Sequence, residues 1–469
     1  MKAWLIAAMV ALVLSACTLG PDYRKPDVDM PGSWRFGEEG KEARASVDTR
    51  WWKQFGDPVL EEMIETAVKD NKDVLIAAAR IEEYMGRYVA VRGEMFPQAS
   101  AGGAAARQRA TQENITGWQK GLSPEYSTYQ VTLNAGWEID LWGKLRRATE
   151  AARADLLSKE ESRRAVLLTL AATVAGSYID LRNLDRQLEI ARQTLETRRA
   201  SLDLFNLRFS GGVVSELELS QVKSEYESAR ATIPQIEKSI FQGENALNVL
   251  LGRNPGLVNR GKSIDELSMP EIPAGLPSDI LERRPDIRQA EQDLIGANAR
   301  IGVARAAYFP SISLTGLFGS LSVELDNLFT GPAQTWNFGG SIVLPVFMAG
   351  RLYGQEKATE AQQKQALIRY RQTVQGAFRE IEDNLVDRSK TMEKMEAQAA
   401  QVDSLRTYRD LALLRYENGY SSYLEVLDAE RNLFNMELTY IQTKGAVFRA
   451  MVNLYKSMGG GWDVELSEK

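Results

Sequence analysis

The sequence predicts a mixed fold, in which long coiled-coil α-helices are combined with four membrane-type β-strands and the whole arrangement occurs twice. Three observations lead to this prediction. One short stretch alternates strictly between apolar and polar residues, which is typical of a strand with one apolar face. Two stretches of about 65 residues carry the apolar spacing of a coiled coil, and similar motifs recur at a constant offset of 207 residues.

The repeat is clearest where each long helical stretch is expected to reverse its direction. Arg208 and Gly212 at the first reversal correspond to Arg415 and Gly419 at the second. Glycine and asparagine adopt the left-handed conformation at little cost, so they can end one helix and let the next begin. The sequence therefore predicts two similar helical hairpins, with tips near residues 208–216 and 415–423.

The strands are predicted from their period of two. From Tyr129 to Leu141 every odd-numbered residue is apolar or aromatic, and every even-numbered residue is polar or glycine. This length suits a tilted transmembrane strand, which needs about 9–11 residues. Weaker patterns complete one pair of strands in each repeat, within about 96–141 and 308–347, from candidates at 98–108, 129–141, 308–318 and 336–347.

These patterns divide the chain into six predicted segments. Each repeat begins with a short helix, continues through its pair of strands and ends in its long helical hairpin. The segment before the first repeat is rich in proline, glycine and tryptophan, so we expect an extended tail that lies over the surface. In chain order the segments are a signal peptide (1–16), a lipidated tail (17–57), the first repeat (58–256), an equatorial linker (257–278), the second repeat (279–458) and a C-terminal tail (459–469).

The composition excludes several classes of function. The chain contains no histidine, which excludes Ser-His catalytic triads and His-ligated zinc sites. Its single cysteine, Cys17, allows neither an internal disulfide nor a cysteine metal cluster, and the net charge of −6 offers no basic surplus for nucleic acid. Met392 and Met395 are spaced about one helical turn apart, but packing in the equatorial belt explains them better than metal binding. We therefore predict no enzyme, no metal site, no cofactor and no nucleic-acid partner.

The N-terminus predicts export and lipid attachment. The apolar run Trp4–Leu14 is too short for a stable membrane span and is typical of a secretory signal. It leads into Leu14–Cys17, Leu-Ser-Ala-Cys, which resembles the bacterial lipobox, so we expect covalent lipid on Cys17. Thr18 follows in place of the aspartate that favours retention in the inner membrane, which implies sorting to the outer membrane.

Four strands are too few to close a barrel in a membrane, because about eight is the smallest number that closes. Open sheet edges find no water to bond in lipid, so several chains must share one barrel. Two chains would give eight strands and a filled interior, whereas three would give twelve strands and leave a lumen. Each long helical stretch would span about 100 Å at 1.5 Å per residue, enough for a conduit across the periplasm.

The chain also resembles a known family. The run Leu281–Glu291, LERRPDIRQAE, resembles a fingerprint of the lipoprotein (NodT-type) branch of TolC-like outer-membrane efflux channels, and Gly20–Tyr23 after the lipobox matches too. The resemblance covers essentially the whole chain. It implies a homotrimer with a twelve-stranded β-barrel in the lipid of the bacterial outer membrane and a helical barrel in the periplasm. It also implies two partners in a tripartite pump, a periplasmic adaptor and an inner-membrane transporter, commonly of the resistance-nodulation-division type.

The resemblance further implies an iris-like gate at the periplasmic tips. By position, Glu425 and Asp428 fall where the family places rings of pore-facing carboxylates, which would attract cations and respond to pH and divalent ions. Glu218 is the counterpart in the first repeat, and Tyr416 is the aromatic residue that in relatives bonds to the neighbouring hairpin. Ser421 departs from the pattern, because many relatives carry a charged residue there. The residues expected to contact the adaptor lie at both tips: Arg208, Gly211, Gly212, Arg415, Asn418 and Gly419.

Two other functions remain open from the sequence. A type I protein-secretion system also uses an outer-membrane duct, although the lipobox and the LERRPD run favour efflux. A periplasmic coiled-coil scaffold lipoprotein without a pore would explain the lipobox and the heptads. That scaffold leaves the strand at Tyr129–Leu141 unexplained.

Overall fold

The computed structural model describes residues 18–30, 32–35, 50–111, 123–270 and 280–460. They form two compact units. The first contains residues up to Asp27, Ile81–Lys159 and Ala290–Tyr370, and the second contains Val28–Arg80, Glu160–Gln289 and the residues from Arg371 onward. The predicted signal peptide, Cys17 and residues 461–469 lie outside the described residues.

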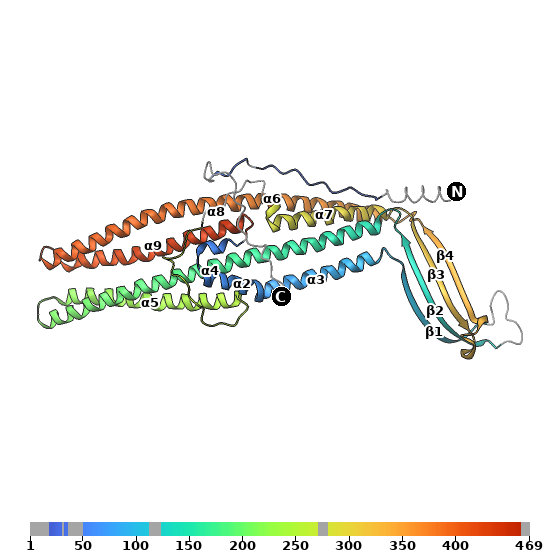
Figure 1. The fold of residues 1–469 in the computed structure, drawn as a ribbon, viewed down its shortest axis with the longest axis horizontal. Helices are drawn as coiled ribbons and strands as arrows, with labels where there is room; N and C mark the ends of the chain where they lie inside the picture. The colour runs from blue at the N-terminus through green and yellow to red at the C-terminus, as the bar shows by residue number, and fades with distance from the viewer. Residues whose placement is uncertain (1–17, 31, 36–49, 112–122, 271–279, 461–469) are drawn as a thin grey trace. The chain divides into compact units, whose positions relative to one another are not determined.

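Most of the described chain is α-helical (Figure 1). The long helices show the repeat directly, because α4 and α8 each contain 67 residues and α5 and α9 each contain 35. In chain order the helices are η1 (Trp51–Phe55), α2 (Pro58–Asp70), α3 (Lys72–Gly93), α4 (Lys144–Ser210), α5 (Glu216–Leu250), α6 (Ile280–Arg283), α7 (Pro285–Ala306), η3 (Leu325–Asn327), η4 (Gly331–Ala333), α8 (Arg351–Glu417) and α9 (Tyr423–Ser457).

The first unit contains one antiparallel sheet with the strand order β1-β2-β3-β4. Both predicted pairs are present, and β1 forms although its sequence is mostly alanine and glycine. Within the described residues, β1 and β4 each pair along one side only, so the sheet has two open edges. The strands are β1 (Gln98–Arg109), β2 (Glu125–Ile139), β3 (Ser311–Ser322) and β4 (Gln334–Val343).

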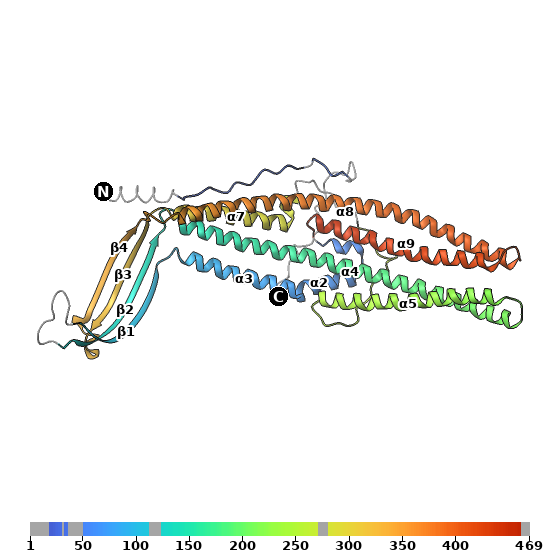
Figure 2. The ribbon, with the colours of Figure 1, turned by 180° about the vertical axis from the view of Figure 1, so that it is seen from behind.

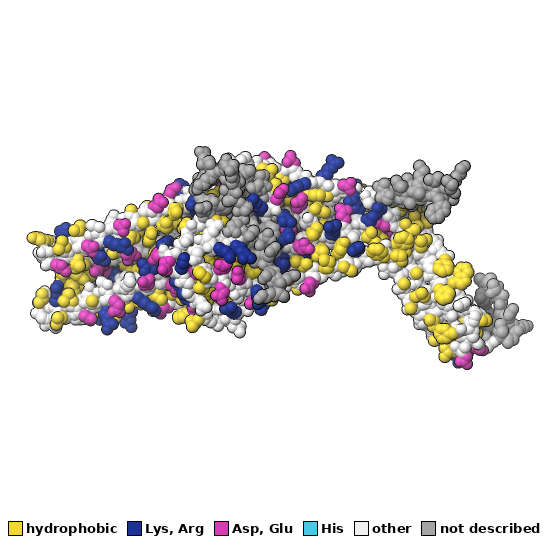
Figure 3. All heavy atoms as spheres, in the orientation of Figure 1, with side chains coloured by type: hydrophobic (Ala, Val, Ile, Leu, Met, Phe, Trp, Pro, Cys, Tyr) yellow, Lys and Arg dark blue, Asp and Glu magenta, His cyan; other side chains and the backbone are white. Residues whose placement is uncertain are grey.

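One face of this sheet is apolar and exposed. The register places Leu133 of β2 opposite Phe318 of β3, and Phe318 opposite Trp336 of β4. These three side chains are 53%, 51% and 69% exposed, respectively. Figure 3 shows apolar side chains on the visible surface of the sheet, whereas acidic and basic side chains gather over the helices. A contiguous exposed apolar face needs a lipid or protein partner, as the period-two pattern predicts.

The N-terminal tail of the first unit is held by specific contacts. Gly20 has φ of +101°, and a Cβ there would lie 2.5 Å from the Cα of Gly302 in α7. Only glycine at both positions allows this close approach. Asp22 accepts a hydrogen bond of 2.6 Å from the buried guanidinium of Arg147 in α4. The tail is therefore docked through the motif Gly20–Tyr23, which the resemblance singles out.

The second unit contains most of the two helical hairpins, α4 with α5 and α8 with α9 (Figures 1 and 2), because α4 enters it at Glu160 and α8 at Arg371. At each tip a glycine takes the left-handed conformation, with φ of +70° at Gly212 and +74° at Gly419. One stretch of α4 is long and apolar enough to cross a membrane by length and composition. Since 61% of that stretch is buried within the described structure, it is typical of a core helix.

The prediction of an extended surface tail up to residue 57 is wrong at its C-terminal end. Trp51, Trp52 and Phe55 lie in η1 and are at most 1% exposed. The Trp51 ring stacks on Tyr455 of α9, with 5.4 Å between centroids. Aromatic rings bury large apolar areas, so this segment belongs to the core although its sequence has no periodicity.

Two further boundaries differ from the prediction. The short helix at the start of the first repeat is two helices, because Asn71 leaves the helical conformation and its Oδ1 caps α3 by accepting from Asp73 N at 2.9 Å. Gly459 and Gly460, predicted to belong to the C-terminal tail, are buried. Gly459 follows α9 with φ of +80°, a position that only glycine occupies easily.

Candidate functional site

The tips of the two hairpins are joined by a small apolar core. The Phe205 and Tyr423 rings lie 4.3 Å apart between centroids, and Tyr416 packs edge-on against Tyr423 at 4.9 Å. Apolar burial therefore holds the first hairpin against the second at the level of the predicted gate. The buried members of this core, which we call the tip core, are Phe205, Val222, Ala412, Tyr423, Val426, Leu427 and Ala429.

A polar contact also joins the tips. Arg208 Nη1 in α4 donates a hydrogen bond of 2.7 Å to the hydroxyl of Tyr416 in α8. The Arg208 guanidinium lies 5.8 Å from the Phe205 ring centroid and 5.9 Å from that of Tyr416, within the range of cation–π attraction. In the first repeat the counterpart of Tyr416 is Phe209, which has no hydroxyl. The repeat is therefore not symmetrical at this contact.

The two hairpins use the same motif, Ser-x-x-Glu, in different ways. Ser215 and Ser422 precede α5 and α9 with the same backbone conformation, φ/ψ of −79°/159° and −78°/159°. Glu218 closes a capping box, in which its Oε2 accepts from Ser215 N at 2.8 Å and Ser215 Oγ accepts from Glu218 N at 3.3 Å. Two hydrogen bonds from Ser215 lower the pKa of Glu218, and the backbone N–H contributes more than the hydroxyl. Ser422 makes no such side-chain cap, which leaves the Glu425 carboxylate available for other contacts.

Each predicted gate carboxylate has an arginine partner in its own hairpin. Glu425 Oε1 lies 3.5 Å from Arg415 Nη1, across the turn at the tip. Asp428 Oδ1 lies 2.7 Å from Arg431 Nη2, one turn further along α9. Both carboxylates face one groove of about 600 Å³ at the start of α5 and α9, lined by Gln221, Ser224, Glu225, Ser422, Leu424, Glu425, Leu427, Asp428 and Arg431.

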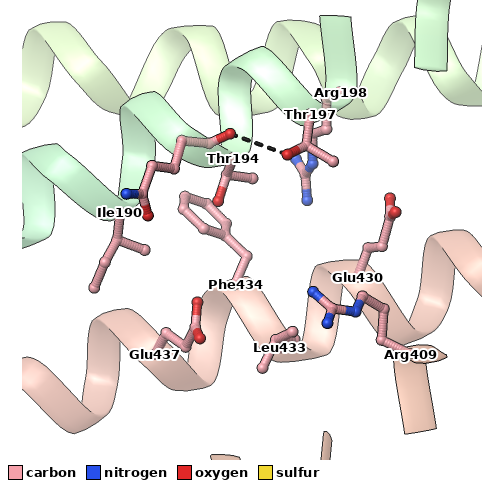
Figure 4. A pocket seen from close by; sticks show the side chains of 10 residues that line it. Ile190, Thr194, Thr197, Arg198, Arg409, Glu430, Leu433, Phe434 and Glu437 are labelled. Atoms are coloured by element: carbon pink, nitrogen blue, oxygen red, sulfur yellow. Dashed lines mark hydrogen bonds between the residues drawn. The ribbon is translucent and has the colours of Figure 1, made fainter. Parts of the chain in front are cut away.

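A second cavity, of about 230 Å³, lies between α4 and the second hairpin (Figure 4). Arg198 extends from α4 toward it, is 3% exposed and pairs with Glu225 Oε2 at 3.0 Å. Glu430 and Arg409 line it from α9 and α8. Burial raises the pKa of Glu430, against the opposing effect of Arg198 and Arg409, and burial lowers the pKa of Arg198. No local sequence pattern predicts this cluster, since charged residues are common along long polar helices.

The remaining predicted residues lie in the turns. Asn418 Nδ2 donates a hydrogen bond of 2.7 Å to Leu414 O and so helps to end α8. Gly211 and Gly212 form the turn of the first tip, where Val213 N donates to Arg208 O at 2.9 Å. Ser421 Oγ is buried and has no hydrogen-bond partner among the described residues. The structure thus brings Arg208 to Tyr416 and Arg415 to Glu425, whereas Glu218 bonds to Ser215 of its own hairpin.

Known proteins of one family match this chain over nearly its full length. The family model described as outer membrane efflux protein matches residues 63–253 and 276–460. The toluene efflux pump outer membrane protein TtgC of Pseudomonas putida is 37% identical over 467 residues, which cover 98% of this chain and 96% of that protein. The cation efflux system protein CusC of Escherichia coli is 35% identical over 462 residues, with 98% of each chain covered.

A solved structure agrees with these relatives. The CmeC outer membrane channel of Campylobacter jejuni superposes with a TM-score of 0.90 at 27% identity, covering 97% of this chain and 96% of that one. The predicted fold class and the predicted efflux function are confirmed, and efflux is favoured over the duct for protein secretion and over the scaffold. The chain therefore belongs to the outer membrane efflux protein family, and it is an outer-membrane efflux channel.

Proposed function

We propose that three copies of this chain form one channel, with a shared twelve-stranded barrel in the outer membrane and a helical conduit in the periplasm. The observation that carries this proposal is the four-stranded sheet, which has an exposed apolar face and two open edges. Unpaired backbone groups are costly in lipid, so β1 of one copy pairs with β4 of the next. Three copies give twelve strands, enough to leave a lumen.

The channel is the outer-membrane component of a tripartite pump for small molecules. Its relatives are named for toluene efflux and for cation efflux, which supports small organic compounds or ions as cargo. A periplasmic adaptor and an inner-membrane transporter of the resistance-nodulation-division type complete the pump. The adaptor contacts both tips, at Arg208, Gly211, Gly212, Arg415, Asn418 and Gly419. Photo-crosslinkers at these positions in the assembled pump should capture the adaptor, and crosslinks found only elsewhere would contradict this contact.

The gate is formed by the same tips. Glu425 and Asp428 face the pore where the hairpins converge, and Tyr416 latches the second hairpin to the first through Arg208. Glu218 is occupied as a helix cap, so its role is to fix the first tip. Ser421 supplies no charged lock, because a serine side chain carries no charge, and its buried hydroxyl has no hydrogen-bond partner in the described structure.

Lipid on Cys17 anchors each subunit to the outer membrane. The lipobox supports a thioether-linked diacylglycerol and an acylated amino group, such as palmitate, and each buried CH₂ contributes about 0.8 kcal/mol. Mass spectrometry of the mature protein should show the lipid mass on the peptide that begins at Cys17. An N-terminal peptide without that mass would contradict the anchor.

The channel proposal is tested with the purified full chain. Light scattering in detergent should give a mass three times that of one chain, and the protein should conduct ions across a planar lipid bilayer. Cell fractionation should place it with the outer membrane. A monomer in detergent, or a bilayer without currents, would refute the shared barrel.

A further inference from the structure

We propose that Arg415 and Arg431 neutralise Glu425 and Asp428 within each subunit, so that the gate presents little net charge and these arginines set the ion preference of the channel. The proposal rests on the proposed function, which places both carboxylates at the constriction. It differs from the expectation drawn from the resemblance, in which carboxylate rings attract cations.

The geometry of the groove supports the pairing. Asp428 Oδ1 lies 2.7 Å from Arg431 Nη2, and Glu425 Oε1 lies 3.5 Å from Arg415 Nη1. Glu225, the third carboxylate that lines the groove, is 3.0 Å from Arg198 Nη2. Every carboxylate that lines this groove therefore has a guanidinium of its own.

Both pairs form between residues of one subunit. Asp428 and Arg431 are one turn apart on α9, where side chains three positions apart face each other. Arg415 and Glu425 flank the same tip turn, and Glu425 is free to pair because Ser422 does not engage it as a cap. The charge balance is thus built into a single hairpin and persists when the tips move apart.

The effect on permeation follows from charge balance. A carboxylate beside a guanidinium acts on a passing ion as a dipole, whose field decays faster than that of a lone charge. Removing one arginine per subunit would leave three uncompensated carboxylates around the axis of the trimer. In a narrow pore a permeating ion passes these carboxylates within the Debye length, about 8 Å at physiological salt, so salt screens them only partly. We expect about a threefold rise in the cation-to-anion permeability ratio from such a change.

The test measures reversal potentials of the full-length channel in planar bilayers under a potassium chloride gradient. We expect a permeability ratio near one for the unmodified channel, a cation-selective Arg431→Gln and an anion-selective Asp428→Asn. The double variant Arg431→Gln/Asp428→Asn should return to the unmodified value, because it restores neutrality. Arg406→Gln is the matched control, since it removes the same charge from a residue of α8 that pairs with Glu437 and does not line the groove.

The outcomes separate this inference from the channel itself. An unmodified channel that is already strongly cation-selective, with no change in Arg431→Gln, would overturn the neutralisation. An equal shift in Arg406→Gln would also overturn it, because the effect would then be one of total charge. Arg415→Gln should shift the ratio in the same direction as Arg431→Gln. A protein that carries no current would refute the proposed channel instead.

Discussion

Phe205→Ala tests whether the tip core keeps the two hairpins together. The Phe205 side chain is 1% exposed and contacts Tyr423 of the other hairpin at 4.3 Å between ring centroids. Replacing a buried phenylalanine by alanine costs about 3–5 kcal/mol. Because Val222 of its own hairpin belongs to the same core, we assign the lower value, about 3 kcal/mol, to packing between hairpins. This corresponds to about a hundredfold shift toward separated tips.

The assay is hydrogen exchange of the full-length channel, followed by mass spectrometry of the peptides at the start of α9. In Phe205→Ala, amides of residues 423–429 should exchange faster, and the bilayer conductance should rise as the gate loosens. Asn206→Ala is the matched control, since Asn206 is adjacent in α4 and exposed. Unchanged exchange and conductance in Phe205→Ala would show that the tip core does not hold the hairpins.

Three further predictions address the latch, the buried carboxylate and the docked tail. Tyr416→Phe removes the hydroxyl that accepts from Arg208, so it should weaken tip packing by about 1–2 kcal/mol; the same exchange experiment measures this, and unchanged exchange would argue against a latch. Burial raises the pKa of Glu430 in the packed tips. The packed state therefore binds a proton more tightly than separated tips do, so acidification stabilises closure and this gain is lost as pH rises through the raised pKa. Conductance should fall as the pH is lowered through the raised pKa, and Glu430→Gln should remove that dependence. A persisting dependence would assign it to another group. Gly302→Val places a Cβ 2.6 Å from the backbone oxygen of Leu19, so it should release the N-terminal tail to trypsin, and an unchanged digestion pattern would contradict the docking.

The sequence predicted the strands and hairpins because each depends on a local pattern. The alternation from Tyr129 to Leu141 and the tip glycines are both readable without tertiary information. The burial of Trp51 and the break at Asn71 could not be predicted in this way. Trp51 stacks on Tyr455 of α9, and Asn71 Nδ2 donates a hydrogen bond of 2.9 Å to Leu250 O. Both contacts join residues that are far apart in the chain.

The site shows the same limit. The resemblance placed Glu425 and Asp428 at the tips. Arg431 is one turn from Asp428 on the same helix, but the Arg415 partner of Glu425 depends on how the tip turn folds back. Glu218 and Glu425 occupy equivalent positions in identical motifs on the same backbone, and only one of them caps its helix. The shared Ser-x-x-Glu motif alone does not distinguish the two glutamates. The two glutamates differ in their tertiary contacts, because Arg415 pairs with Glu425.

The open edges of the sheet have a genetic consequence. A subunit that supplies only four strands can complete a barrel only together with the copies on either side. A variant that folds and joins the ring but cannot complete it would disable wild-type copies in the same assembly. Co-expression of such a variant should therefore act dominantly over the normal gene, whereas a variant that fails to fold at all should be recessive.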